Sequence, residues 1–338
     1  MKRSIAFILV LALVIGIFQF VGKQISGDGD VQALNVTIMV SSEFGDKAIN
    51  DSAHDGGEAL KDDGLKVKYI ECKNENFKKN MMDAAAESDV VVCVGWEFWE
   101  ITDVSVEYPN VKFIWADNAV DEPEEYPNLL SIMYAQNEGA YLVGYLSSAM
   151  SQTGTVGLVA GSEDTSVNDF IVGFRQGAKD CNSGTRILTA SANGDYDNPE
   201  LGERLAYGLV DDGADVVFQV AGYTGTGVYK AAKKRGFYAI GVDKDHKIEF
   251  PEYEDAILCS VKKDVGKSIR KIVYQYALEE KFDGGRVLLA NMAKGYIDVV
   301  YGDDSSTQLV DSSLMEELQD LKTDIIDGNL TVDTARAQ

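Results

Sequence analysis

Apolar and polar positions follow two alternating periods along most of the chain. Short apolar runs with strand character recur between stretches whose apolar residues repeat with helical spacing. The run at 89–94 (DVVVCV) is continuous and β-branched, as expected of a strand that is buried on both faces of a sheet. This alternation of strands and helices predicts an α/β fold with doubly wound parallel sheets.

The pattern assigns a type to most segments after residue 34. We expect strands over 35–40, 65–71, 89–94, 111–115, 129–133, 155–160, 185–190, 215–220, 238–242 and 256–261. We expect helices over 46–61, 76–88, 137–150, 168–180, 198–212, 227–235 and 263–280. A hairpin-like segment is expected over 287–301.

The series of elements runs once before residue 134 and a second time after it, which predicts two similar lobes. The elements after residue 256 are expected to cross between the lobes. The first lobe is then residues 35–133 with about 262–295, and the second is 134–261 with about 296–330. Two such lobes form a cleft that can close on a ligand.

The N-terminus has the features of a membrane-targeting segment. Lys2 and Arg3 precede an apolar run from Ile5 to Val21, which is close to the length that spans a bilayer. Neither a small-x-small cleavage pattern nor a lipid-accepting cysteine follows the run. We therefore favour an uncleaved anchor over a removed signal peptide, with residues 22–34 as a tether and the body outside the cytoplasm.

Charge and composition narrow the possible functions. The formal net charge of −24 disfavours nucleic-acid binding, because phosphates would repel the chain. The chain has four cysteines and no CxxC pair, so neither a zinc ribbon nor a redox motif is supported. Cys93 and Cys259 lie in apolar strand-like runs and are expected to be buried thiols, whereas Cys72 and Cys181 could pair.

Sequence features of enzymes are sparse. The chain has two histidines, and it lacks HExxH, GxSxG and GxxxxGK[ST]. The acidic run 121–125 (DEPEE) is expected to be a solvated loop. We therefore expect neither catalysis, nor a cofactor, nor a metal site.

Three polar segments at predicted strand ends are candidates for ligand contact. The segment 221–227 (AGYTGTG) permits either a tight turn or the approach of backbone N–H groups to a neutral ligand. In 45–54 (GDKAINDSAH), Asn50 and Asp51 can read a heterocycle edge, and helix capping by Asp46, Asn50 or Asp51 is the alternative. In 241–245 (GVDKD), Asp243 can accept two hydrogen bonds from a vicinal diol, or it is a solvated loop acid.

These segments together resemble the basic membrane protein family of ABC-transporter substrate-binding proteins, which includes purine nucleoside receptors. The resemblance spans about residues 36–300, and it is carried by the spacing of several motifs. They are GDKAINDSA (45–53), DVVVCVGWEFWE (89–100), NVKFIWAD (110–117), AQNEGAYLVGYLSSAMSQTGTVGLVAG (135–161), FIVGFRQGAK (170–179), DDGADVVFQVAGYTGTGVYKAAKKRGFYAIGVDKD (211–245) and CSVKKDV (259–265).

The resemblance implies a type I periplasmic-binding fold and an ABC permease as the membrane partner. It implies that Asn50 and Asp51 read a purine base and that Phe170 stacks on it. It further implies that Asp243 holds the ribose hydroxyls and that Lys263 reaches the sugar. Asp117 and the Gly222 loop would line the cleft.

The chain departs from the family pattern at four places. The lipid-accepting cysteine is absent, which concerns the mode of anchoring. His54 replaces an aromatic after NDSA and can stack or donate a hydrogen bond. Tyr223 replaces a glycine and can narrow the cleft, and Trp96 replaces a phenylalanine and can enlarge the stacking surface.

The leading hypothesis is therefore an extracytoplasmic receptor that captures a purine nucleoside for an ABC importer. A receptor for another small polar solute, such as riboflavin, is the alternative within the binding class. A nucleoside-processing enzyme and a membrane-coupled sensor are the alternatives from other classes.

Overall fold

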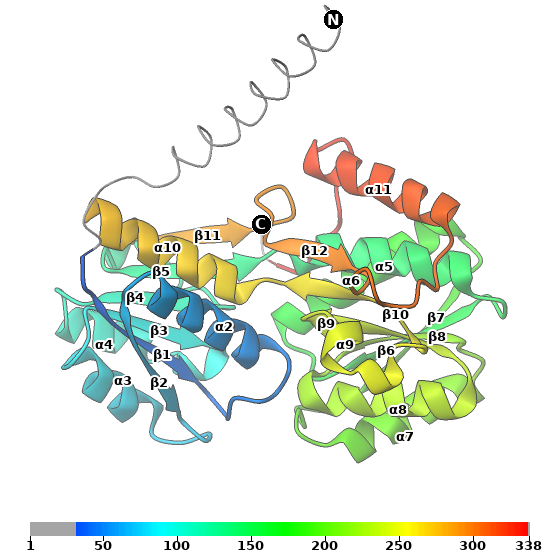
Figure 1. Cartoon of the computed structure of the whole chain (residues 1–338), viewed down its shortest axis with the longest axis horizontal. Helices are drawn as coiled ribbons and strands as arrows, with labels where there is room; N and C mark the ends of the chain where they lie inside the picture. Colours follow the sequence, from blue (N-terminus) through cyan, green and yellow to red (C-terminus); the bar gives the residue numbers. More distant parts are fainter. Residues whose placement is uncertain (1–31, 337–338) are drawn as a thin grey trace, which may run out of the picture.

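The computed structural model describes residues 32–336, which form two six-stranded sheets side by side (Figure 1). The first sheet has the order β11-β5-β4-β3-β1-β2, and the second has the order β12-β10-β9-β8-β6-β7. The first contains β1 (Asn35–Val40), β2 (Lys66–Glu71), β3 (Val90–Val94), β4 (Lys112–Ala116), β5 (Leu129–Tyr134) and β11 (Arg286–Ala290). The second contains β6 (Thr155–Ala160), β7 (Arg186–Ser191), β8 (Val216–Val220), β9 (Tyr238–Asp243), β10 (Ile257–Lys263) and β12 (Ile297–Val300).

Helices cover both sheets, and we call each sheet with its helices a lobe (Figure 1). The first lobe has α2 (Ile49–Asp62), α3 (Phe77–Ala85), α4 (Ile101–Glu107) and α10 (Val265–Glu279). The second has α5 (Gln136–Met150), α6 (Thr165–Cys181), α7 (Pro199–Asp211), α8 (Thr226–Arg235), α9 (His246–Glu249) and α11 (Ser312–Ile326). Short 3-10 turns occupy Trp96–Phe98, Pro123–Glu125, Gly222–Gly225 and Pro251–Tyr253.

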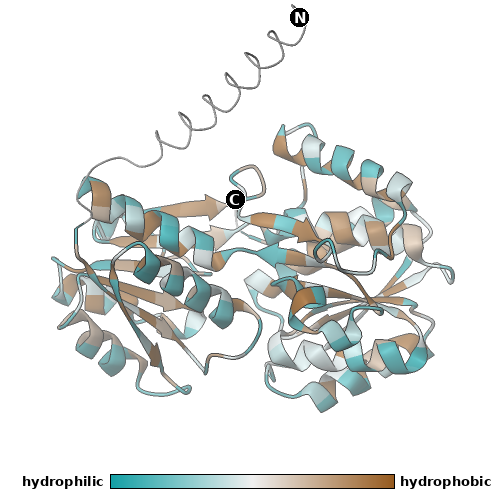
Figure 2. Cartoon of the chain, in the orientation of Figure 1, coloured by the Kyte–Doolittle hydropathy of each residue, from teal (hydrophilic) through white to brown (hydrophobic). Residues whose placement is uncertain are grey.

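The sheets are parallel, apart from the antiparallel pairing of β12 with β10. Every residue of β3 and of β8 is buried, because helices pack on both faces of these central strands. Figure 2 shows that the strands inside each lobe are mostly hydrophobic (brown), whereas the helices expose hydrophilic residues (teal) outward. The expected α/β fold with doubly wound sheets is confirmed.

The chain crosses between the lobes three times, after β5, after β10 and after β11. The predicted hairpin over 287–301 is wrong. β11 pairs with β5 in the first sheet, whereas β12 pairs with β10 in the second. Two short apolar runs close together in sequence suggest a hairpin, but the connection between them, residues 291–296, passes from one lobe to the other.

Other differences concern the ends and the number of helices. Helix α2 begins at Ile49 rather than near Asp46, because the Asp46 carboxylate accepts the N–H groups of Ala48, Asn50 and Asp51 and holds the preceding residues in a loop. Helices α4, α9 and α11 were not predicted. All four cysteines are free, and Cys93 and Cys259 are buried as expected.

Two helices of the second lobe pack unusually closely through glycines. A Cβ atom on Gly173 of α6 would collide with the carbonyl oxygen of Asn137 on α5. Gly144 of α5 and Gly177 of α6 make equally close backbone contacts with the opposite helix. This close approach matters for the site, because α5 follows the first crossing and α6 carries Phe170.

We expect Gly173→Ala to lower the free energy of unfolding by about 1–3 kcal/mol, because the added methyl group must push two helix backbones apart. Gly208→Ala is the matched control, since Gly208 lies inside α7 and a Cβ there meets nothing within 4 Å. The control should be neutral or stabilising by up to about 1 kcal/mol. Urea unfolding of both variants measures the difference, and equal stabilities would contradict the packing argument.

None of the helices in residues 32–336 combines the length and the apolar character that a bilayer span requires. The predicted anchor Ile5–Val21 lies outside the described residues.

Candidate functional site

One lysine joins an aspartate from each lobe at the interlobe junction. Lys263, the last residue of β10, donates a hydrogen bond from Nζ to Oδ2 of Asp117 at 2.9 Å. The same Nζ lies 3.8 Å from Oδ1 of Asp243, the last residue of β9. Asp117 follows β4 of the first sheet, so all three side chains come from the carboxyl ends of strands, where α/β folds bind ligands.

The two aspartates share an uncommon backbone conformation. Asp117 has a φ of 67° and Asp243 a φ of 68°, in the left-handed region that residues other than glycine rarely adopt. Such conformations cost free energy and occur most often where function fixes the direction of a side chain. Both carboxylates are thus turned towards Lys263 at the cost of local backbone strain.

Several buried polar atoms of this region have no hydrogen-bond partner. Within residues 32–336 they are Asp117 Oδ1, Gln136 Oε1, Asp169 Oδ2 and Asp243 Oδ1. Leaving such an atom unsatisfied costs about 1–3 kcal/mol, and each one calls for a specific explanation. All four are hydrogen-bond acceptors, but Asp169 Oδ2 is ion-paired with Arg336 at 3.1 Å. A ligand that supplies O–H or N–H donors could satisfy Asp117 Oδ1 and Asp243 Oδ1 beside Lys263.

Burial dominates the electrostatics of the centre. It raises the pKa of Asp243 to about 6, with Lys263 opposing the shift and Asp117 and Asp46 adding to it. Burial also raises the pKa of Asp117, again against the attraction of Lys263. Burial alone would lower the pKa of Lys263, but the two aspartates raise it above its usual value. The lysine therefore stays charged.

Aromatic rings enclose the ammonium group of Lys263. Its Nζ lies 5.6 Å from the ring centre of Tyr134 and 5.8 Å from that of Phe170. Phe170 is only 4% exposed, and its ring meets Phe218 of the core edge-on at 6.0 Å. The ring of Phe170 thus belongs to the core on one side and borders the charged centre on the other.

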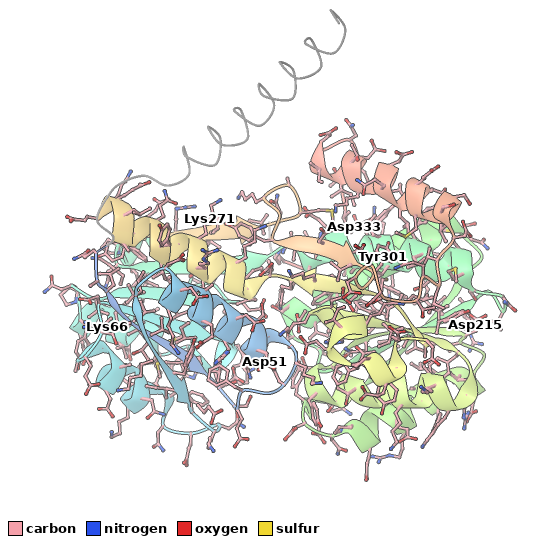
Figure 3. The ribbon with its side chains drawn as sticks, viewed as in Figure 1. Asp51, Lys66, Asp215, Lys271, Tyr301 and Asp333 are labelled. Carbon is pink, nitrogen blue, oxygen red and sulfur yellow. The ribbon has the colours of Figure 1, made fainter. Side chains whose placement is uncertain are left out.

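The loop before α2 is held by its own acidic side chains. Asp51 accepts the N–H groups of Gly45 at 2.6 Å and of Lys47 at 3.0 Å, in addition to the contacts of Asp46 described above. Asn50 is buried, and its amide nitrogen donates to Ser42 Oγ and to the carbonyl oxygen of Glu43, both at 3.0 Å. In Figure 3, Asp51 lies on the side of the first lobe that faces the second.

Two predicted residues, His54 and Trp96, make no contact with the Lys263 centre in the structure. His54 stacks on Tyr69 at 4.6 Å, and its Nε2 lies 3.7 Å from Glu58. Trp96 is 63% exposed, in the 3-10 turn that follows β3.

The glycine-rich segment after β8 forms a 3-10 turn, and this geometry favours the turn interpretation. Gly222 has a φ of 54°, and its Cα faces the ring of Tyr196. Tyr223 is partly exposed beside it.

Sequence reasoning missed other polar residues at the same strand ends. Tyr196 donates to Ser162 Oγ at 2.8 Å, and Asp164 caps α6 by accepting the N–H of Val167 at 3.0 Å. Burial raises the pKa of Glu97, and the negative charges of Asp164 and Asp117 add to this shift. Ser162 and Asp164 follow β6, and Glu97 follows β3, so the strand-end rule applied to every strand would have found them.

The C-terminal segment 331–336 also reaches the junction. Arg336 lies 3.1 Å from the buried carboxylate of Asp169 and donates to Asn137 Oδ1 at 3.0 Å and to the carbonyl oxygen of Tyr134. Asp169 precedes Phe170 on α6, while Tyr134 and Asn137 flank the first crossing. The tail therefore connects the helix that carries Phe170 to the crossing between the lobes.

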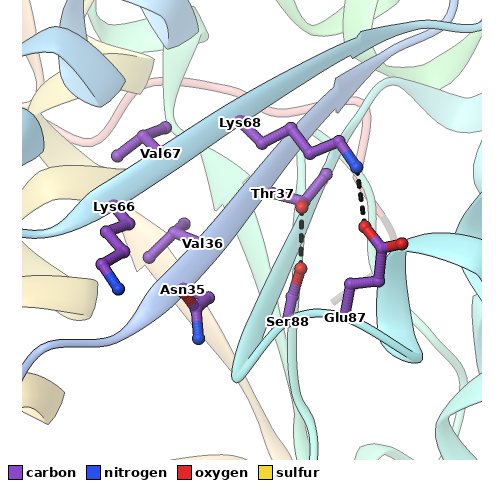
Figure 4. Close-up of a pocket in the computed structure, with 8 residues that line it drawn as sticks. All are labelled: Asn35, Val36, Thr37, Lys66, Val67, Lys68, Glu87 and Ser88. Carbon is purple, nitrogen blue, oxygen red and sulfur yellow. Dashed lines mark hydrogen bonds and ion pairs between the residues drawn. The ribbon is translucent and has the colours of Figure 1, made fainter.

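The pocket in Figure 4 lies at a different edge of the molecule. It has a volume of about 230 Å³ at the amino ends of β1 and β2, where Thr37 bonds Ser88 at 2.7 Å and Lys68 pairs with Glu87 at 2.8 Å. These four side chains pair with one another, and the pocket is opposite to the strand ends that bind ligands in such folds. In residues 32–336, no group of three or more His, Cys, Asp or Glu side chains is placed to hold a metal ion.

Comparison with solved structures confirms the expected type I periplasmic-binding fold. A solute-binding protein of an ABC transporter system from Aeropyrum pernix K1 superposes with a TM-score of 0.77 at 21% identity, over 89% of this chain and 93% of that one. A counterpart from Conexibacter woesei gives a TM-score of 0.74 at 22% identity, over 90% and 100% of the two chains.

Sequence comparison supplies the family. Basic membrane protein A2 of Borrelia garinii subsp. bavariensis is 28% identical over 316 residues, which is 91% of each chain. Basic membrane protein D of Borreliella burgdorferi is 30% identical over 287 residues, which is 81% of each. The family described as "ABC transporter substrate-binding protein PnrA-like" matches residues 33–334. This chain therefore belongs to the PnrA-like family of ABC transporter substrate-binding proteins.

Proposed function

We propose that the protein is an extracytoplasmic receptor that captures a purine nucleoside between its lobes and delivers it to an ABC permease. The observation that carries the proposal is a pair of buried carboxylate oxygens beside Lys263 that accept no hydrogen bond, Asp117 Oδ1 and Asp243 Oδ1. The proposed attachment to the membrane through Ile5–Val21 is a separate part of this hypothesis.

A ribose ring matches the donors and acceptors of this centre. Its hydroxyl groups can each donate a hydrogen bond to one of the two carboxylates, and their oxygens can accept from the Lys263 ammonium. Hydrogen bonds to charged groups contribute about 1.5–3 kcal/mol each, more than neutral ones. A vicinal pair of sugar hydroxyls can donate to both oxygens at once, and a free base has no such pair of hydroxyls.

The proposed base contacts are Phe170 and Asn50, and Asp51 supports them. Phe170 lies beside Lys263, so an aromatic base in contact with its ring would stay within reach of the sugar centre. The Asn50 side-chain nitrogen is already bonded inside the first lobe, which leaves its carbonyl oxygen as the group offered to a base N–H. Asp51 contributes mainly through the loop that it holds in place.

A thermal-shift screen tests the proposal. Inosine, guanosine and adenosine at about a hundred times their dissociation constant are expected to stabilise the protein by about 2.7 kcal/mol. The corresponding free bases at the same concentrations should stabilise it by less. Ribose and riboflavin serve as comparison ligands. If no nucleoside changes the melting temperature, the nucleoside assignment is wrong. A shift with riboflavin alone would favour the other polar-solute receptor.

The same samples separate binding from turnover. A substrate-binding protein should return the nucleoside unchanged after prolonged incubation, and chromatography of the mixture measures this. Release of free base in proportion to protein concentration would contradict a purely binding role.

A further inference from the structure

A second set of contacts joins the lobes away from the Lys263 centre. They connect the loop before α2 and the helix itself to the segment around α9. We call this set the latch; its members are Lys47, Asp55, Lys244, His246, Glu249 and Phe250.

Lys47 makes most of the latch contacts. Its carbonyl oxygen accepts a hydrogen bond from His246 Nε2 at 2.9 Å, and its Nζ donates to the carbonyl oxygen of Glu249 at 2.6 Å. The same Nζ lies 4.3 Å from the ring centre of Phe250, within the range of a cation–π contact. One first-lobe residue thus binds three residues of the second lobe through both its backbone and its side chain.

His246 is held in the orientation that this contact needs. It is buried, and its backbone N–H donates to Ser260 Oγ at 3.0 Å. Because a carbonyl oxygen can only accept, Nε2 carries the proton, and Nδ1 then accepts from the hydroxyl of Tyr229. Burial lowers the pKa of His246 to about 4, so the ring is neutral at pH 7. The second lobe therefore presents a fixed neutral donor to Lys47.

An ion pair at the outer edge extends the latch. Lys244 Nζ lies 2.9 Å from Asp55 Oδ2 on α2 of the first lobe and 2.9 Å from Glu249 Oε1 of its own lobe. The lysine is largely enclosed, whereas Asp55 is mostly exposed. This pair contributes less than the Lys47 contacts, because solvent screens it.

The latch is directly linked to the loops that carry the proposed ligand residues. Lys47 lies between Asp46 and Asn50, and its left-handed backbone, with a φ of 52°, directs its carbonyl oxygen towards His246. Lys244 and His246 follow Asp243 within three positions in sequence. The latch therefore fixes two loops at once, one from each lobe, without using the Lys263 centre.

We propose that Lys47 and His246 are positioning residues that hold the lobes in the closed arrangement and so set the rate at which ligand leaves. They act through the loops of Asp46–Asp51 and Asp243 and need not touch the ligand. The proposal depends on the protein closing around a solute, but it does not depend on that solute being a nucleoside.

Distances between spin labels on the two lobes test the latch. Lys79→Cys on α3 and Arg204→Cys on α7 place labels at exposed sites far from the crossings, in a Cys181→Ser background (Figure 1). Lys47→Met should lower the ratio of closed to open molecules about tenfold, as expected for losing a hydrogen bond from a charged group. Lys68→Met is the matched control, since it removes an exposed ion pair within the first lobe.

A distance distribution for Lys47→Met that equals that of Lys68→Met would overturn the proposal. Asp55→Asn, which alters only the exposed outer pair, should give a smaller shift in the same direction. With inosine as the probe, Lys47→Met should raise the dissociation rate about tenfold. If inosine, guanosine and adenosine all fail to bind, the nucleoside hypothesis fails, while the spin-label result still decides the latch.

Discussion

Replacing Lys263 with methionine is expected to lower the free energy of unfolding at pH 7 by about 3–5 kcal/mol. Lys263 is 4% exposed, and it is the cation placed between the carboxylates of Asp117 and Asp243. Without it, two buried negative charges would remain with no compensation. Urea unfolding at pH 7 measures the effect.

Two further variants show whether charge or packing causes the loss. Lys262→Met is the matched control, because Lys262 neighbours Lys263 on β10 but pairs with Asp264 at a partly exposed site. Its cost should stay below about 1 kcal/mol. Adding Asp117→Asn and Asp243→Asn to Lys263→Met should restore much of the stability. If the triple variant is as unstable as Lys263→Met, the loss comes from packing rather than from unpaired charge.

Asp243→Asn is expected to weaken nucleoside binding about a hundredfold while stabilising the ligand-free protein. The first effect follows from losing charge-assisted hydrogen bonds to the sugar, each of which contributes about 1.5–3 kcal/mol. Free-base binding should change much less. Isothermal titration with inosine and hypoxanthine checks this difference, and an equal loss for both would reject the assignment of Asp243 to the ribose.

The stabilising effect of Asp243→Asn should depend on pH in a defined direction. Burial raises the pKa of Asp243 to about 6 from its usual value of 3.8, so the folded protein binds more protons than the unfolded chain between these values. Its contribution to stability therefore falls as pH rises from about 4 to about 6, and it reaches a cost on the order of 3 kcal/mol above that window.

Comparing Asp243→Asn with the wild type isolates this contribution. The stability advantage of the variant should be small near pH 4 and largest above pH 6. His246 acts in the opposite direction, because its lowered pKa makes acid destabilising, but it is present in both proteins and cancels in the difference. Asp320→Asn, at an exposed position of α11, is the matched control for this comparison.

The sequence pattern was sufficient for the fold because most strands are central and parallel. A continuous apolar run such as 90–94 is typical of a strand whose two faces are both covered, and β3 is indeed fully buried. The pattern failed at 287–301, because apolar residues identify a strand but not the sheet that it joins. β11 and β12 are short, partly exposed strands at the edges of their sheets, so tertiary contacts decide which sheet each one joins.

The site was predictable to the extent that ligand groups follow strand ends. Asp117, Asp243 and Lys263 end or follow strands, and the structure brings them together. His54 could not be placed from sequence, because its direction depends on packing against Phe44 and Tyr69 of the same lobe. The ion pair between Asp169 and Arg336 could not be predicted either, because the two residues lie far apart in the sequence and no local pattern links them.

The way in which the chain crosses between the lobes has a consequence for its synthesis. Strand β5 forms early, but its neighbour β11 enters the chain more than a hundred and fifty residues later, pairing Arg286 with Leu130. Until then the edge of β5 has unpaired N–H and C=O groups, which favour association with other chains. A nascent chain that stops before residue 286 would keep this edge open, so premature termination should yield aggregating fragments rather than an independent first lobe.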